Sequence, residues 1–98
     1  KIHNKLDIKV IDKKGRPINN VLIYRDGYTT VSNSQGFTTM NFYKKGMFRI
    51  HLKHKKYVQT EIIFYSNQNS ELIARKVIMK KKNVFTKLKE FIFPSTRG

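Results

Sequence analysis

The residues of this chain that could carry out chemistry are three histidines, six carboxylates and a large excess of lysine and arginine. The histidines are His3, His51 and His54, and the absence of cysteine excludes thiol nucleophiles and zinc sites with cysteine ligands. His51 and His54 are three residues apart, and on a strand this spacing sends two side chains to opposite faces. We therefore expect surface or turn roles for both, and no shared metal.

The carboxylates do not form a recognisable acid–base pair. Asp7, Asp12 and Asp26 lie in turns, beside turns or among lysines, whereas catalytic carboxylates need a shared buried site that separates their pKa values. We expect no catalytic residue, no metal, no cofactor and no small-molecule substrate. The chain is predicted not to be an enzyme.

The remaining chemistry is positive charge. The 98 residues contain 21 Lys and Arg against 6 Asp and Glu, which gives a net charge of +15, yet 39% are hydrophobic, enough to fold one domain. Residues 1–74 have a net charge of +8, and residues 75–98 have a net charge of +7. This shift predicts a folded body over residues 1–80 and a basic tail over residues 81–98.

The tail combines charge with a helical pattern. Its apolar residues follow the spacing i, i+1, i+4, i+7 and i+8, which predicts a short amphipathic helix that begins after Asn83 and ends before Pro94. Because so short a helix is marginal alone, its apolar face must be covered by the body, by a partner protein or by an anionic membrane. The predicted partner-binding residues are Lys80, Lys81, Lys82, Phe85, Lys87, Leu88, Phe91 and Ile92.

The body that positions this tail has the period-two alternation of β-strands. β-branched and aromatic residues alternate with polar ones, and the runs are separated by turns that contain glycine or proline. This pattern predicts an all-β fold, a seven-stranded antiparallel Ig-like or transthyretin-like sandwich with a short C-terminal helix. The expected strands are residues 6–11, 21–24, 28–31, 37–42, 48–53, 60–65 and 72–79, and the structural turn residues are Gly15, Pro17, Gly27, Gly36 and Gly46.

Four of these elements come in an order that resembles a known family. Residues 10–18 match a strand that ends in D-x-x-G-x-P, and they are followed by a V-x-I strand, an S-N-S-Q-G-F turn and a G-x-F-x-I strand. Over residues 6–65 the chain resembles the transthyretin-like modules called carboxypeptidase regulatory-like domains. The resemblance implies a usually non-catalytic sandwich that acts as a spacer or interaction platform in bacterial cell-envelope assemblies, in the periplasm or at the cell surface.

A related enzyme family shares two further features with the chain. The hydroxyisourate hydrolases look similar in their Gly15-Arg16-Pro17 turn and in ending with Arg97-Gly98. Where that family carries a catalytic histidine this chain has Lys9, and where it carries a tyrosine this chain has Thr96. Without the imidazole there is no general base, so the resemblance does not predict this activity.

Nucleic acid is the alternative partner for so basic a chain. Residues 42–45 and 53–57 interleave cations with aromatic side chains, as single-strand binders do. Most aromatic residues, however, fall on the alternating strands and are expected in the core. We therefore expect a non-catalytic protein-interaction or structural module of a cell-envelope or secretion-type assembly, with a nucleic-acid-binding domain as the alternative.

Overall fold

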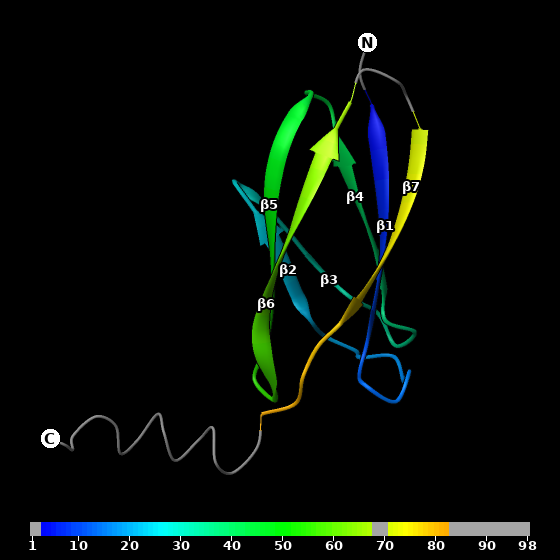
Figure 1. Cartoon of the computed structure of the whole chain (residues 1–98), viewed down its shortest axis with the longest axis vertical. Helices are drawn as coiled ribbons and strands as arrows, with labels where there is room; N and C mark the ends of the chain where they lie inside the picture. The colour runs from blue at the N-terminus through cyan, green and yellow to red at the C-terminus, as the bar shows by residue number, and fades with distance from the viewer. Residues whose placement is uncertain (1–2, 68–70, 83–98) are drawn as a thin grey trace, which may run out of the picture.

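A computed structural model describes residues 3–67 and 71–82, which form two β-sheets packed face to face (Figure 1). The strands are β1 (Asn4–Ile11), β2 (Leu22–Arg25), β3 (Tyr28–Val31), β4 (Phe37–Phe42), β5 (Gly46–His54), β6 (Tyr57–Ser66) and β7 (Glu71–Ile78). The predicted all-β sandwich of seven strands is confirmed. Among the described residues no helix has the length and apolarity of a membrane span, and the predicted C-terminal helix lies outside them.

The strand order is β4-β1-β7 in one sheet and β3-β2-β5-β6 in the other. Every pair is antiparallel except β1 with β7, which run parallel from Asn4 beside Glu71 to Ile11 beside Ile78. The prediction of a wholly antiparallel sandwich is therefore wrong at this pair. Each connection reverses the chain, so odd-numbered strands run one way, and β7 meets β1 in the same direction (Figure 1).

The core lies between the sheets and is made by alternate residues of each strand. In β1, Leu6, Ile8 and Val10 are fully buried. The Phe42 ring contacts the rings of Phe48 and Phe64, with centroids 4.9 and 4.7 Å apart, and so joins the two sheets. The other buried apolar side chains are Ile11, Ile18, Val21, Ile23, Met40, Ile50, Leu52, Val77 and Met79. Burial of this set is the main stabilising contribution to the fold.

Two arginines on the inward faces of the sheets link the two sheets, one at each side of the sandwich. Arg25, two residues after buried Ile23 on β2, donates a hydrogen bond from Nη2 to the Asn41 carbonyl of β4 at 2.8 Å. Arg75 on β7 donates from Nη1 and Nη2 to the Ile63 carbonyl of β6, at 3.3 and 3.1 Å. β4 and β6 are edge strands, and inward-pointing charges are one way in which proteins protect such edges.

The turns at the ends of β1 and β3 pack tightly against each other. Gly36 has φ +79°, and a Cβ there would lie 2.5 Å from the carbonyl oxygen of Val10. Its own carbonyl accepts a hydrogen bond from the Val10 N–H at 2.8 Å. Gly15 and Gly27 also lie in turns, Pro17 forms an isolated bridge with Ile11, and Gly46 is the first residue of β5.

Candidate functional site

Eight cationic side chains gather at the end of the sandwich where β5 meets β6. They come from three segments far apart in sequence, namely the turn after β1, the β5–β6 turn and the chain after β7 (Figure 1). Three shallow hollows adjoin here. Each of four residues lines two of them, namely Lys55, Tyr57, Lys81 and Lys82. This group, the basic end, consists of Lys13, Lys14, Arg16, Lys53, Lys55, Lys56, Lys81 and Lys82.

The chain after β7 is fixed to this end by backbone hydrogen bonds. The Val58 N–H donates to the Lys80 carbonyl at 2.7 Å, and the Lys82 N–H donates to the Lys56 carbonyl at 2.9 Å. Residues 80–82 thus leave the three-stranded sheet and pair with the start of β6 in the other sheet. The structure therefore places Lys81 and Lys82 beside the cations of the β5–β6 turn, an arrangement that the sequence did not indicate.

The other predicted partner-binding residues lie outside the described part of the chain. They are Phe85, Lys87, Leu88, Phe91 and Ile92. Their role, like the boundary between a body and a tail at residue 80, stays a prediction.

Among the described residues, Asp12 is the one acidic residue that lines these hollows. Its carboxylate accepts hydrogen bonds from the Lys14 and Arg16 N–H groups, both at 2.9 Å, and from Arg16 Nε at 3.0 Å. The Arg16 backbone bond, followed by the other bonds to Arg16 and Lys14, outweighs burial and lowers the pKa of Asp12. Asp12 therefore offsets Arg16 alone and leaves the seven lysines unpaired among the described residues.

His54 stabilises the β5–β6 turn in its neutral form. Its Nδ1 accepts a hydrogen bond from the Lys56 N–H at 3.1 Å, and its ring packs edge-on against Tyr57 with centroids 5.1 Å apart. Burial lowers the pKa of His54, as do the charges of Lys56 and Lys55, while a backbone hydrogen bond with Asn19 opposes them. The backbone of this turn is thus fixed at Lys56 by an uncharged imidazole.

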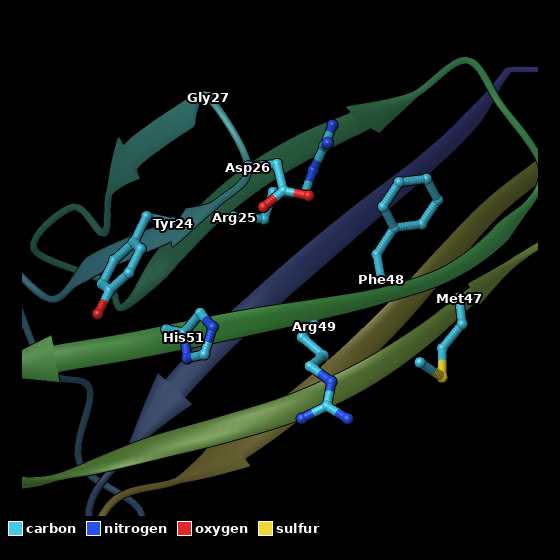
Figure 2. A pocket seen from close by; sticks show the side chains of 8 residues that line it. All are labelled: Tyr24, Arg25, Asp26, Gly27, Met47, Phe48, Arg49 and His51. Atoms are coloured by element: carbon cyan, nitrogen blue, oxygen red, sulfur yellow. The ribbon is translucent and has the colours of Figure 1, made fainter.

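A separate hollow, of about 570 Å³, lies beside the tip of the β2–β3 hairpin (Figure 2). It exists because β2 pairs with β5 only at His51, Leu52 and Lys53. Residues 46–50 of β5 continue past the hairpin with no strand on that side in the described part of the chain. This hollow, the notch, is lined by Tyr24, Arg25, Asp26, Gly27, Met47, Phe48, Arg49 and His51.

Arg25 is the unusual residue of the notch. Its guanidinium lies over the rings of Phe42, Tyr28 and Phe48, at 4.2, 5.0 and 5.1 Å from their centroids. The Nε atom is buried and has no hydrogen-bond partner, and no carboxylate in the described residues forms an ion pair with this side chain. Burial lowers the pKa of Arg25, although the nearby Tyr28 and Asp26 oppose this shift.

Sequence reasoning missed Arg25, although a signal was present. Val21, Ile23 and Arg25 alternate, so an arginine stands on the face that the two apolar residues bury. On the opposite face of the sheet, Tyr24 stacks on His51 at 5.1 Å, and Arg49 pairs with Glu61 at 3.4 Å. Arg49 therefore forms an ion pair, whereas Arg25 forms none in the described residues.

The histidines lie at three separate places. His3 stacks on Tyr43 and forms a hydrogen bond with Asn41, while His51 and His54 pack against different tyrosines. No three side chains of His, Asp or Glu come close enough to hold a metal within residues 3–67 and 71–82.

No protein-family model matches the chain, and no curated protein matches it either. Solved structures do match: the TIE protein of Bacillus anthracis is 20% identical over 82% of this chain, with a TM-score of 0.66. GBS52, a minor pilin of Streptococcus agalactiae, is 13% identical over 85% of this chain, with a TM-score of 0.63. The 3-chlorocatechol 1,2-dioxygenase of Rhodococcus opacus 1CP is 9% identical over 83% of this chain, with a TM-score of 0.67.

At these identities the likeness establishes the fold. The matched region makes up 17% of the TIE protein, 46% of the pilin and 60% of the dioxygenase. The chain therefore has a β-sandwich that occurs as one part of larger proteins, including pilus components and an enzyme. Because one fold can serve unrelated functions, the function has to be argued from the surface of this chain.

Proposed function

We propose that this chain is a non-catalytic interaction module of a bacterial cell-envelope assembly, and that its basic end docks on an acidic partner protein. The observation that carries the proposal is the convergence of three separate segments on one patch of eight cations with Asp12 as its acidic lining residue. Such a patch attracts anionic surfaces over a Debye length, about 8 Å at physiological salt. Sandwich modules in pilins make a surface location a reasonable expectation.

The composition of the patch favours a protein over nucleic acid. Seven of the eight cations are lysines, and lysine is a point charge without the planar fork with which arginine binds phosphate. Single-strand binders also stack bases on exposed aromatic rings. At the basic end Tyr57 is half-buried and packs against His54 and the core, so its ring is already engaged.

The tail would extend the docking surface. Residues 80–82 lie on the edge of β6 at the basic end, so the chain that follows starts from the patch itself. In the proposed complex Phe85, Leu88, Phe91 and Ile92 contact an apolar groove of the partner, and Lys87 adds to the basic surface. The alternatives are a helix that packs on the sandwich and one that lies on an anionic membrane.

Charge reversal at matched positions tests the patch. Lys55, Lys81 and Lys82 are changed together to glutamate, and the control changes Lys5, Lys44 and Lys45, which are exposed and lie outside the basic end, by the same total charge. The probes are polyglutamate, a single-stranded oligonucleotide of equal charge and vesicles that contain anionic lipid, each measured across salt. We expect polyglutamate affinity to fall at least tenfold in the first variant and to change little in the control.

Three results would contradict the proposal. Equal losses in both variants would mean that net charge alone binds the probe. A strong preference for the oligonucleotide, with a steep dependence on salt, would favour nucleic acid instead. A strong preference for the vesicles would favour a membrane surface.

Deletion of residues 83–98 tests the tail. We expect the shortened chain to keep a cooperative thermal transition and to lose affinity for the partner. If the shortened chain unfolds, the tail is part of the core and this role is wrong.

A further inference from the structure

Strand β5 has an unpaired edge over half of its length. From Gly46 to Ile50 it pairs with β6, while on its other side the pairing with β2 ends at His51. These five residues extend for about 17 Å at roughly 3.4 Å per residue. Alternate residues of an antiparallel strand direct their N–H and C=O groups to the same side, so at least two residues present both groups to the notch. An extended segment could pair with them.

A partly buried cation lies beside this edge. The Arg25 guanidinium contacts three aromatic rings and one carbonyl, and its Nε atom is buried without an acceptor. A buried N–H donor costs free energy unless something accepts from it. Figure 2 shows Phe48 on the same side of β5 as Arg25, and Met47 and Arg49 on the other side.

We propose that the notch binds an extended peptide segment of a partner protein, which adds as a strand to β5 at residues 46–50 and places a carboxylate on the Nε–H of Arg25. The occupant is identified by charge complementarity, because Arg49 already pairs with Glu61, whereas Arg25 forms no ion pair in the described residues even with the nearby Asp26. This site is separate from the basic end, so it goes beyond the proposed function and its failure would leave that proposal standing.

The lining of the notch also specifies the side chains of the segment. Successive residues of a strand face opposite sides, so the carboxylate stands opposite Phe48, on the inward face that Arg25 occupies. The next inward residue, two positions along, stands opposite Gly46. Nothing lies within 4 Å of the position of a Cβ at Gly46, so there is room for a side chain there. The position that the notch specifies is therefore the acidic residue opposite Phe48.

A free anion or a second copy of the chain fits the notch less well than a peptide segment of a partner protein. A free anion would accept from Arg25 but would leave the backbone groups of β5 and the half-exposed Met47 uncovered. A second copy would have to supply one of its own four edge strands, and in two of these, β4 and β6, one carbonyl already accepts from Arg25 or Arg75 in the described residues.

Peptide pools test the proposal on the full chain. One pool of hexapeptides carries glutamate at the third position and valine, isoleucine or threonine elsewhere, and the matched pool carries glutamine in place of the glutamate. We expect the glutamate pool to bind at least tenfold more tightly. In hydrogen exchange we expect amides within residues 46–50 to slow at least tenfold, while those of β1 change little.

Variants separate Arg25 from general charge. Arg25→Met should reduce binding of the glutamate pool to the level of the glutamine pool, and Arg75→Met, an equal charge change on the other side of the sandwich, should not. Equal affinity for both pools, or binding without protection of residues 46–50, would overturn the proposal. It would also fail if acetate alone gave the same protection, or if the free chain dimerised with those amides already protected.

Discussion

The basic end and the notch differ in how completely their polar groups are satisfied. At the basic end, Asp12 accepts three hydrogen bonds, His54 accepts one, and residues 80–82 are paired with β6. In the notch, β5 has an open edge and Arg25 has a buried N–H without a partner. The more highly charged region therefore has these polar groups hydrogen-bonded, whereas the less charged region has polar groups without partners. A buried polar group without a partner is uncommon in folded proteins, which is why Arg25 calls for an explanation.

The largest difference between the two regions is expected from their turn glycines. Gly36, next to the basic end, and Gly27, next to the notch, have φ of +79° and +63°, but only a Cβ at Gly36 would meet a neighbour. Gly27→Ala should cost about 1–2 kcal/mol for the left-handed backbone. Gly36→Ala should cost at least about 3 kcal/mol because the Val10 carbonyl must also move. Urea unfolding of both variants measures this, and equal costs would contradict the tight packing.

Ser32 should show the next largest effect, because it is buried and fully satisfied. Its Oγ donates to the Ile18 carbonyl at 2.8 Å and accepts from the Val21 N–H at 2.9 Å. Ser32→Ala leaves both backbone groups without a partner and should destabilise the fold by about 2 kcal/mol. The control is Ser34→Ala at an exposed turn position, which should change stability by less than about 0.5 kcal/mol. Similar losses of stability in both variants would contradict the structural role of the two Ser32 hydrogen bonds.

Arg25→Met tests the same comparison in the notch. The variant loses the hydrogen bond to Asn41 and the aromatic contacts, but it also removes a partly buried charge and its buried, unsatisfied Nε–H. These contributions oppose each other, so stability should change by less than about 1 kcal/mol. Chemical denaturation measures it. A loss as large as that of Ser32→Ala would show that the notch is as complete as the basic end.

The smallest expected effect is the pH dependence that Asp12 confers. Its pKa is lowered in the folded chain from an ordinary 3.8, so its contribution is present above that pH and is lost as the pH falls through the folded value. Wild type should therefore lose stability more steeply than Asp12→Asn below about pH 4. Thermal melts between pH 2 and 6 measure this, and parallel curves would exclude the contribution of Asp12.

The fold was predictable from the sequence to the extent that local patterns decide it. Alternation located all seven strands, and β3 and β4 have the expected limits. β6 begins at Tyr57 and not at Thr60, because the turn at Lys55 and Lys56 needs only two residues. The parallel pairing of β1 with β7 was missed because it depends on the number of chain reversals, which no local pattern records.

The surface was less predictable than the fold. Lys13, Lys55 and Lys81 are far apart in sequence, and only the topology brings their turns together. The notch depends on a difference in length between β2 and β5, four residues against nine, which becomes visible only once the two strands are paired. The alternation of Val21, Ile23 and Arg25 was a local signal that Arg25 faces the core. At the end of a strand, however, an arginine is easily taken for an ordinary surface residue.

The parallel pair of β1 and β7 has a mechanical consequence. Because both strands run in the same direction, tension applied through the start of β1 and the end of β7 slides the two strands past each other along their length. All eight residue pairs between them, from Asn4 to Ile11, then resist at the same time and do not open one by one. In single-molecule pulling from these two points we expect a high unfolding force, and a much lower one when the same sandwich is pulled across the strands. Such a module would transmit force along a fibre or a surface appendage without lengthening.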